Sequence, residues 1–505
     1  MSSRRADALT VLLLAAASAA VLAGLGRLPA LTSDESWIGL YALQRHSSWF
    51  SSPHEMNTYT GPIYGMLVSL VFAGRGVSVS ALRLLGAAAN AAAFVILIGS
   101  LRRRVSAEAA AWGAALLAGS AYLLLKSRLA WEVYALQPLL LAVTLALLDA
   151  PVTALRALLF CAVTLIGVQN HFIYLSVPVS LCVLYGVRAA WLAEDGARPW
   201  LRLSLSALAM GAVVFLVKPH LTDAAWPAER VWALPLFLSL APLAAAAART
   251  GAWEAPLVEA LRTKKVWPQR FLGLSLAAFV IWHAAPLWQA IAGPVVWKRL
   301  FSWPAPWWLA LPLDLWSTFL LGLLAWRATR AWHGRMSPYE RTLALWPACY
   351  ASIFILFRNT SSLRYYSPIQ FICLVSLAAA LPRLPRPDRK AALALAAFAV
   401  AAVQGVFWRE FAGPGDRRPL SFKIGWHAEN SRDFARKDGL FAAFDASGAC
   451  AVDHQERSFT SIPLNFHRAE TGLLACDPAK AFDADQCPDC AAPPFYRWGV
   501  VSSRP

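Results

Sequence analysis

The chain has 505 residues, of which 58% are hydrophobic and only 15% are charged, and its mean hydropathy is +0.49. So few charged residues exclude an ordinary soluble protein of this length, because they could not cover its water-facing surface. The net charge of +17 would suggest nucleic-acid binding in a soluble protein, but the basic residues stand in short clusters between apolar runs, so we predict a polytopic membrane protein with no nucleic-acid partner.

The first apolar run predicts a first membrane helix and the side on which the chain begins. Arg4 and Arg5 precede a run from Ala8 to Leu25, which is longer than the ~7–15 residues of the hydrophobic part of a secretory signal. We therefore expect an uncleaved helix with a cytoplasmic N-terminus, since basic residues stay on the cytoplasmic side.

The next basic cluster, Arg102 to Arg104, leads us to expect a long external loop before it. Cytoplasmic positions for both clusters allow only two crossings between them. The segment GPIYGMLVSLVFA at 61–73 is too short to cross comfortably and is predicted to form an interfacial helix. Residues 29–79 are thus predicted to form an external loop with one or more helices lying on the membrane.

Later basic clusters recur at intervals that leave room for two apolar runs between neighbouring pairs. This pattern predicts about thirteen spans, including a short cytoplasmic turn near Asp149, and the odd number places the C-terminus outside. Arginine far outnumbers lysine and alanine is abundant, which suggests a bacterial source and hence the inner membrane. The predicted fold is therefore an all-α, multi-pass domain over residues 1–409.

The composition changes at the end of the chain. Residues 410–505 are polar and contain no run of membrane length, so we predict a small soluble domain, α/β in class, on the extracytoplasmic side. It holds four cysteines: Cys450, Cys476, Cys487 and Cys490. An even number in a small external domain favours two disulfides with unknown pairing; the CPDC segment alone also fits half of a redox or zinc site.

Carboxylates and cations gather in the predicted external loops. Asp34 and Glu35 follow the first span directly, and several later loops carry arginine, lysine or tyrosine. A carboxylate can act as general base on an acceptor hydroxyl or amine, and arginine offers a fork that matches phosphate. This combination suggests transfer of a group from a lipid phosphate to an acceptor outside the cytoplasm, which agrees with a sequence that has no P-loop or GxGxxG pattern for a nucleotide.

Several short motifs, in order, resemble the GT-C superfamily of integral membrane glycosyltransferases, close to the branch of protein O-mannosyltransferases and aminoarabinose lipid A transferases. The acidic pair resembles that branch's DE motif in its first external loop. The family's interfacial segment and the start of its second helix are similar to YTGPIYGMLVSLVFAGRGVSVSALRLLGA, and the opening of its fourth helix is similar to SRLAWEVYALQPLLLA. Its tH motif is similar to QNHF, and its late RYllP motif is similar to RYYSP. Together these motifs run from Asp34 to Pro368.

The resemblance implies a reaction in which a sugar leaves a dolichyl or undecaprenyl phosphate and is inverted in one displacement. Asp34 would be the general base for the extracytoplasmic acceptor, and Glu35 a second, supporting carboxylate. The competing interpretation is that the pair only places negative charge at a helix N-terminus, an effect of ~0.3–1 kcal/mol.

Seven residues are predicted to bind substrate. The resemblance implies Arg128 and Glu132 beside the donor head group, Arg364 and Tyr365 at the lipid phosphate, and Tyr59 and His171 from their motifs. His54, in the first external loop, is a further hypothesis. The simpler alternatives are an i,i+4 pair on one helix for Arg128 and Glu132, and an interfacial aromatic belt for Arg364 and Tyr365. For His171 the simpler alternative is a buried histidine held by a hydrogen bond.

Metal dependence is left open by the spacing of the acids. Some relatives use a divalent cation held by separated acids, whereas the acids here are adjacent, so we assign no metal ligand and no certain cofactor. Other functions fit the same compartment: a transporter or flippase, or a polymerase or ligase, for lipid-linked sugars. The lack of a clear internal repeat favours the transferase over the transporter, and no motif identifies the sugar or the acceptor.

Overall fold

The computed structural model describes residues 2–26, 31, 33–43, 60–222, 229–263, 307–333, 336–353 and 367–412, and towards the C-terminus 421–424, 427–430, 443–453, 466–467, 469–470 and 477–483. The named elements up to residue 412 are all helices, and the named strands follow them. The class of the predicted fold, a helical multi-pass protein, is therefore confirmed.

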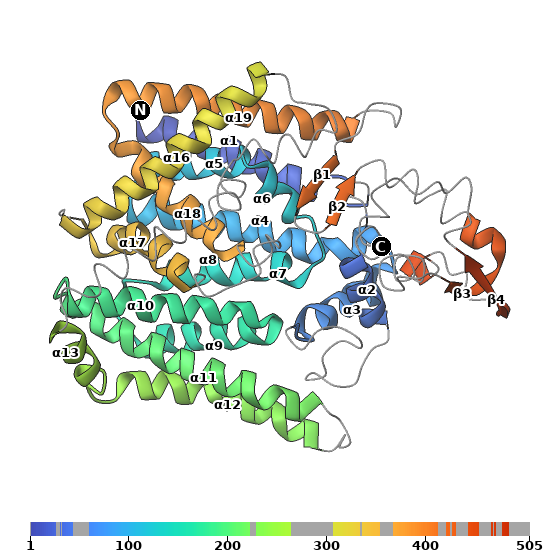
Figure 1. Ribbon diagram of the computed structural model, residues 1–505, viewed down its shortest axis with the longest axis horizontal. Coiled ribbons are helices and arrows are strands. Elements are labelled where there is room, and N and C mark those ends of the chain that lie inside the picture. The colour runs from blue at the N-terminus through green and yellow to red at the C-terminus, as the bar shows by residue number, and fades with distance from the viewer. Residues whose placement is uncertain are drawn as a thin grey trace, which may run out of the picture.

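The first half of the chain forms a series of helices and two short 3-10 turns. They are α1 (Ser3–Leu22), α2 (Ser33–Leu43), α3 (Ile63–Arg75), α4 (Val79–Arg104), α5 (Ala107–Ala118), α6 (Ala121–Lys126), α7 (Glu132–Ala135), α8 (Gln137–Leu147), α9 (Ala154–Asn170), η1 (Phe172–Leu175), α10 (Ser176–Ala190), η2 (Asp195–Ala197), α11 (Arg198–Thr222), α12 (Glu229–Arg249) and α13 (Ala255–Thr263). Figure 1 shows α8, α9, α10, α11 and α12 lying side by side along the length of the molecule.

The described residues of the second half add four α-helices, one 3-10 turn and then strands. They are α16 (Trp307–His333), α17 (Pro338–Ile353), α18 (Ser367–Ala380), η5 (Leu381–Arg383), α19 (Arg386–Ala412), β1 (Ser421–Ile424), β2 (His427–Asn430), β3 (Ala449–Asp453) and β4 (Asp477–Asp483). β1 and β2 pair antiparallel, and β3 and β4 pair parallel.

Four helical segments in the described part of the chain are long and apolar enough to cross a membrane. They are α1, α4, Phe172–Ala190 and Asp195–Leu216. Shorter apolar helices, such as α5 and α9, lie among them. The chain is thus a multi-pass membrane protein, while the count of about thirteen spans stays a prediction.

Local sequence explains where the helices around the site begin. Ser78 precedes α4 and its hydroxyl accepts a hydrogen bond from the Ala81 amide, and Ser106 caps α5 in the same way. Serine at this position satisfies an amide that the helix itself leaves without a partner. The predicted interfacial helix is present as α3, beginning at Ile63 after Pro62. Its depth in the membrane stays a prediction.

Most of the buried apolar residues in the described part of the chain belong to two clusters. The larger one joins α1, α4, α5, α8, α9, α10, α11, α17 and α18. The smaller one joins α2, α3, the first turns of α4, the α7 region and Phe466 from the C-terminal part. In Figure 1, α2 and α3 lie at one end of the helical body, on the side of the strands, and α13 lies at the other.

The predicted turn near Asp149 is present. α8 ends at Leu147 and α9 begins at Ala154, and Asp149 itself has a φ of 56°. A non-glycine residue in this region is uncommon, and its carboxylate is fixed by Arg188 at 2.6 Å.

The described parts of residues 410–505 contain strands and short helical turns, the elements expected for an α/β unit. The last long helix, α19, runs to Ala412, beyond the boundary predicted at 409. The side chains of Cys450, Cys476, Cys487 and Cys490 lie outside the described residues, so their disulfides stay a prediction. The other four cysteines are free, as expected of packing residues in apolar runs: Cys161, Cys182, Cys349 and Cys373.

Candidate functional site

The acidic pair opens α2, and its second member is fully buried. Glu35 forms a two-pronged ion pair with Arg83 of α4: Nε donates to Oε1 at 2.7 Å and Nη2 donates to Oε2 at 2.8 Å. Both side chains are 0% exposed. A parallel pair of charge-assisted hydrogen bonds fixes the plane of both groups as well as their distance.

The same ion pair reaches two further segments through backbone groups. The Ala130 amide, between α6 and α7, donates to Glu35 Oε1 at 2.8 Å, and Arg83 Nη1 donates to the Leu25 carbonyl at 2.9 Å. One buried pair therefore joins the end of α1, the start of α2, the start of α4 and the α6–α7 loop. Such complete hydrogen bonding is what allows two charges to remain away from water.

Asp34 precedes Glu35 in the first turn of α2 but has a different environment. Its side chain is partly exposed, whereas Glu35 and Ser36 are buried. Neighbouring residues in a helix point about 100° apart, so the fixed direction of Glu35 also fixes a different direction for Asp34. The two acids that the sequence presents as a pair are thus unlike in the structure.

Arg128 lies in the α6–α7 loop and closes the end of α1. Its guanidinium donates to the carbonyls of Ala20, Val21 and Gly24, the last at 2.8 Å. These carbonyls have no partner within α1 itself, so the arginine satisfies them. Burial, and after it the charge of Arg83, lower the pKa of Arg128 to about 9, which leaves the group charged at neutral pH.

Glu132 opens α7 and is hydrogen-bonded to the loop before α3. Its Oε1 accepts from the Thr60 hydroxyl at 2.9 Å, and its carbonyl accepts from Asn170 Nδ2 at 2.9 Å. α6 ends at Lys126 and α7 begins at Glu132, so Arg128 and Glu132 do not share one helix. The i,i+4 pair is therefore not their arrangement.

His171 follows α9 and takes part in a backbone joint. Its Nδ1 accepts from the Ile173 amide at 3.1 Å, and its main chain forms a bridge with Thr60. Beside it, the Gly61 amide donates to the Asn170 carbonyl at 3.0 Å. A Cβ at position 61 would lie 1.4 Å from the Gln169 carbonyl oxygen, so only glycine fits this approach. The geometry of His171 is thus that of the simpler alternative, a buried histidine held by a hydrogen bond.

The other residues predicted to bind substrate lie outside the described part of the chain: His54, Tyr59, Arg364 and Tyr365. Their roles stay predictions. Groups of three or more metal-ligating His, Cys, Asp or Glu side chains do not occur among the described residues. His54 and Glu55 lie outside the described residues.

Arg83, the partner of Glu35, was not predicted from the sequence. It stands in the LRL segment and is the one charged residue of α4 before Arg102. A single charge within an apolar helix is expected to have a partner, and this signal could have linked it to the acidic pair. Nearby, the ammonium of Lys126 lies 4.9 Å from the Tyr134 ring centre and 6.0 Å from that of Trp131.

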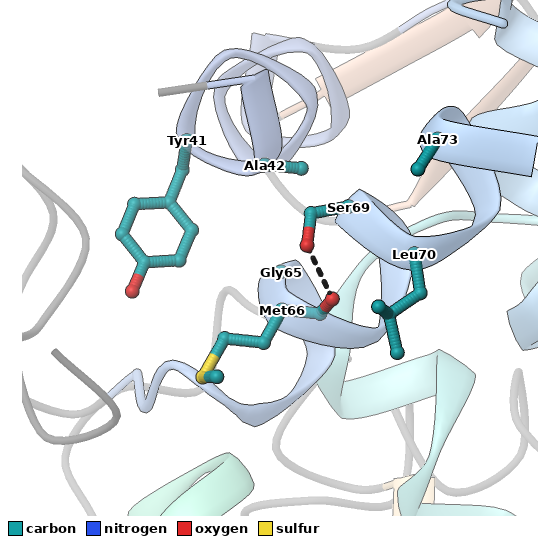
Figure 2. A pocket seen from close by; sticks show the side chains of 7 residues that line it. All are labelled: Tyr41, Ala42, Gly65, Met66, Ser69, Leu70 and Ala73. Carbon is teal, nitrogen blue, oxygen red and sulfur yellow. Dashed lines mark hydrogen bonds between the residues drawn. The ribbon is translucent and has the colours of Figure 1, made fainter. Parts of the chain in front are cut away.

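A pocket of about 350 Å³ lies between α2 and α3. Figure 2 shows the side chains of Tyr41, Met66 and Leu70 around it, together with Ser69, whose hydroxyl donates to the Met66 carbonyl at 2.6 Å. The only side-chain polar group of the lining besides this serine is the phenol of Tyr41. Tyr41 is seven residues after Asp34 in α2, about two helical turns along the same side of the helix.

No family model matches the chain, and no curated protein matches its sequence. Solved structures are similar to it. The oligosaccharyltransferase of Archaeoglobus fulgidus in complex with zinc and sulfate has 16% identity and a TM-score of 0.49, over 86% of this chain and 55% of that one. The same archaeal enzyme, AglB, in complex with an inhibitory peptide and a dolichol-phosphate has 14% identity and a TM-score of 0.46, over 86% and 57%.

ArnT from Cupriavidus metallidurans bound to undecaprenyl phosphate is also similar, with 12% identity and a TM-score of 0.38 over 92% of this chain and 85% of that one. The chain thus spans a little over half the length of the archaeal enzyme but most of the length of ArnT.

Proposed function

We propose that this protein is a membrane glycosyltransferase that moves a sugar from a polyprenyl phosphate to an acceptor outside the cytoplasm. The observation that carries the proposal is the difference between the two acids of the DE motif. Glu35 is buried and fully engaged by Arg83 and the Ala130 amide, while Asp34 is partly exposed. One acid serves as an anchor, and the other is presented to a reactant.

In the proposed reaction, Asp34 takes the proton of the acceptor hydroxyl or amine. The acceptor atom forms a bond to the anomeric carbon from the face opposite the phosphate. The bond between that carbon and the phosphate oxygen breaks, and the oxygen keeps the electron pair as lipid phosphate. A positioned general base of this kind contributes about 10²–10⁴ in rate.

The structure changes the role that we propose for Arg128 and Glu132. Arg128 satisfies the end of α1, and Glu132 fixes the loop before α3, so we assign both to the support of the site rather than to direct contact with the sugar. Arg364 and Tyr365 remain our candidates for the phosphate, with Tyr59, His54 and His171 around the sugar.

The pocket between α2 and α3 supports a lipid-linked substrate. It lies along the side of α2 that carries Asp34, and its lining is mainly aliphatic and sulfur-containing. Such a lining suits a hydrocarbon chain better than a sugar, which needs hydrogen-bond partners when it is buried. We propose the bacterial inner membrane as the location, with the N-terminus in the cytoplasm and residues 410–505 outside.

The direct test is Asp34→Asn in purified protein reconstituted in vesicles, with a panel of radiolabelled undecaprenyl-phosphate sugars and a membrane extract as acceptor. We expect transfer to fall by about 10²–10⁴-fold, with unchanged yield and thermal unfolding. The matched control is Asp195→Asn, which alters a largely exposed aspartate (89%) in η2 and should leave transfer unchanged.

Transfer by Asp34→Asn at the wild-type rate would remove Asp34 from the mechanism. A flippase would instead move labelled lipid between leaflets without releasing polyprenyl phosphate, so measuring that product separates the transferase from a transporter.

A further inference from the structure

Phe466 belongs to the C-terminal part of the chain but is buried against the helices that carry the acidic pair. Its side chain is 0% exposed and belongs to the apolar cluster of α2, α3 and the start of α4. Its ring centre lies 6.3 Å from that of Phe72 in α3. The residue therefore packs with the site helices although it lies far along the chain from both.

Gly39 of α2 is the point where this ring meets the helix. A Cβ at position 39 would lie 2.2 Å from a ring carbon of Phe466, closer than atoms can approach. Gly39 is four residues after Glu35, and residues at this spacing lie on one face of a helix. The ring thus presses on the face of α2 that carries the anchoring acid.

Glu470 makes a second contact from the same segment. Its Oε1 accepts from the Val79 amide, the first residue of α4, at 3.0 Å. A carboxylate is favourable at a helix N-terminus, where amides lack partners. Val79 precedes Arg83 by one helical turn, so Glu470 fixes the start of the helix that carries the other half of the buried ion pair.

The segment is itself held by the C-terminal part. His467 Nε2 and Asp445 Oδ2 lie 2.9 Å apart, which ties the residue next to Phe466 to the helical turn at 443–447. The Asp477 amide then donates to the Gly448 carbonyl at 2.9 Å, and β3 pairs with β4. Contacts therefore run without a break from β3 and β4 to α2 and α4.

We propose that Phe466 and Glu470 are positioning residues for the transfer reaction. The C-terminal segment holds α2 and the start of α4 in the relative position at which the Glu35–Arg83 pair directs Asp34 towards the acceptor. This inference rests on the proposed role of Asp34, and it gives residues 410–505 a part in the reaction that requires no direct contact with the substrate.

The test is a double-mutant cycle on Gly39→Ala and Phe466→Ala, with kcat and KM measured for each variant and for the pair. Gly39→Ala forces the ring away, and we expect kcat to fall about 10- to 100-fold, because a small misplacement of a reacting group has effects of this size, while KM changes little. In the double variant the new methyl group meets no ring, so we expect a smaller loss than the product of the two single losses.

Gly74→Ala is the matched control, because a Cβ at position 74 of α3 meets nothing within 4 Å; it should leave kcat unchanged. Phe466→Leu serves where Phe466→Ala fails to fold, and Glu470→Gln should retain activity that Glu470→Ala loses, since the amide oxygen can still accept from Val79. The proposal would be overturned if the losses in kcat from Gly39→Ala and Phe466→Ala multiply in the double variant. It would also be overturned if Phe466→Leu and Glu470→Ala each have a normal kcat.

Hydrogen exchange gives a readout that does not depend on transfer. Phe466→Leu should increase exchange of the backbone amides of α2 and leave those of α9 unchanged, because the ring packs with α2, α3 and the start of α4. If no polyprenyl-phosphate sugar is a substrate of the wild type, the proposed function is wrong. Hydrogen exchange then tests only whether Phe466 holds α2 in place. Unchanged exchange in α2 would overturn the proposal.

Discussion

The two ends of the helical body both contain buried ion pairs, but they are built differently. At the end with α13, Arg188 lies 2.6 Å from Asp149 and 2.6 Å from Glu194, and Glu194 also pairs with Arg341. The two acids are thus paired with two arginines, one in α10 and one in α17. At the end with α2, one arginine holds one acid, and the adjacent acid is partly exposed.

The difference leads us to propose different roles for the two arrangements. The cluster around Arg188 joins α10 and α17 to the residues after α8 and before η2. At the other end, the role that we propose for the Glu35–Arg83 pair is to direct Asp34. This difference in role can be tested by replacing the buried arginine at each end with methionine.

Arg83→Met should have the largest effect on stability. It leaves Glu35 as a buried charge without its arginine, a loss of about 3–5 kcal/mol, and it should also abolish transfer, because α2 and α4 lose their common anchor. Thermal unfolding and transfer are measured on the same preparation.

The double variant Glu35→Met/Arg83→Met separates the two effects. Replacing both charges by apolar side chains should restore most of the stability but not the transfer. Recovery of transfer in the double variant would show that the pair does not direct Asp34.

Arg188→Met at the opposite end should have a smaller effect. Asp149 is left as a buried charge without its arginine, but Glu194 keeps Arg341, so we expect a loss of about 3 kcal/mol, the lower end of the range for a broken buried pair. Transfer per folded molecule should stay normal. A fall in kcat comparable to that of Arg83→Met would contradict the division between the two ends. Asp7→Asn, in the exposed pair with Arg102, is the control and should change neither quantity.

Undecaprenyl phosphate should give the smallest but most general signal, a rise in the unfolding temperature of the purified protein. A ligand present at 100 times its dissociation constant stabilises a native protein by about 2.7 kcal/mol. The rise should persist in Arg188→Met. Geranylgeraniol, which has isoprene units but no phosphate, is the control. An equal rise with geranylgeraniol would mean that the phosphate is not recognised.

The sequence predicted the helical class, the helix now seen as α3 and the turn at Asp149. The resemblance gave Asp34 and Glu35 different roles, but their different burial could not be predicted, because it depends on Arg83 and the Ala130 amide, which reach Glu35 only after four segments have packed. Hydrophobic periodicity reports which face of a helix is buried but not its partner. The contact of Phe466 with Gly39 is beyond such reasoning for the same reason.

Glu132 shows a similar limit. Its spacing from Arg128 suggested a shared helix face, but the chain leaves the helical conformation between Lys126 and Glu132. The side chain instead reaches Thr60, in a segment 72 residues away.

The joint at Gly61 has a consequence for the stretch of chain before it. Because a backbone atom of Gln169 occupies the space of a side chain at position 61, the chain re-enters the helical body at one fixed point. α2, where it departs, is fixed equally well by Glu35. The contacts that fix α2 and the return of the chain at Gly61 therefore come from α4, the α6–α7 loop and the end of α9. The two points that bound residues 44–59 are thus set by the helical body itself.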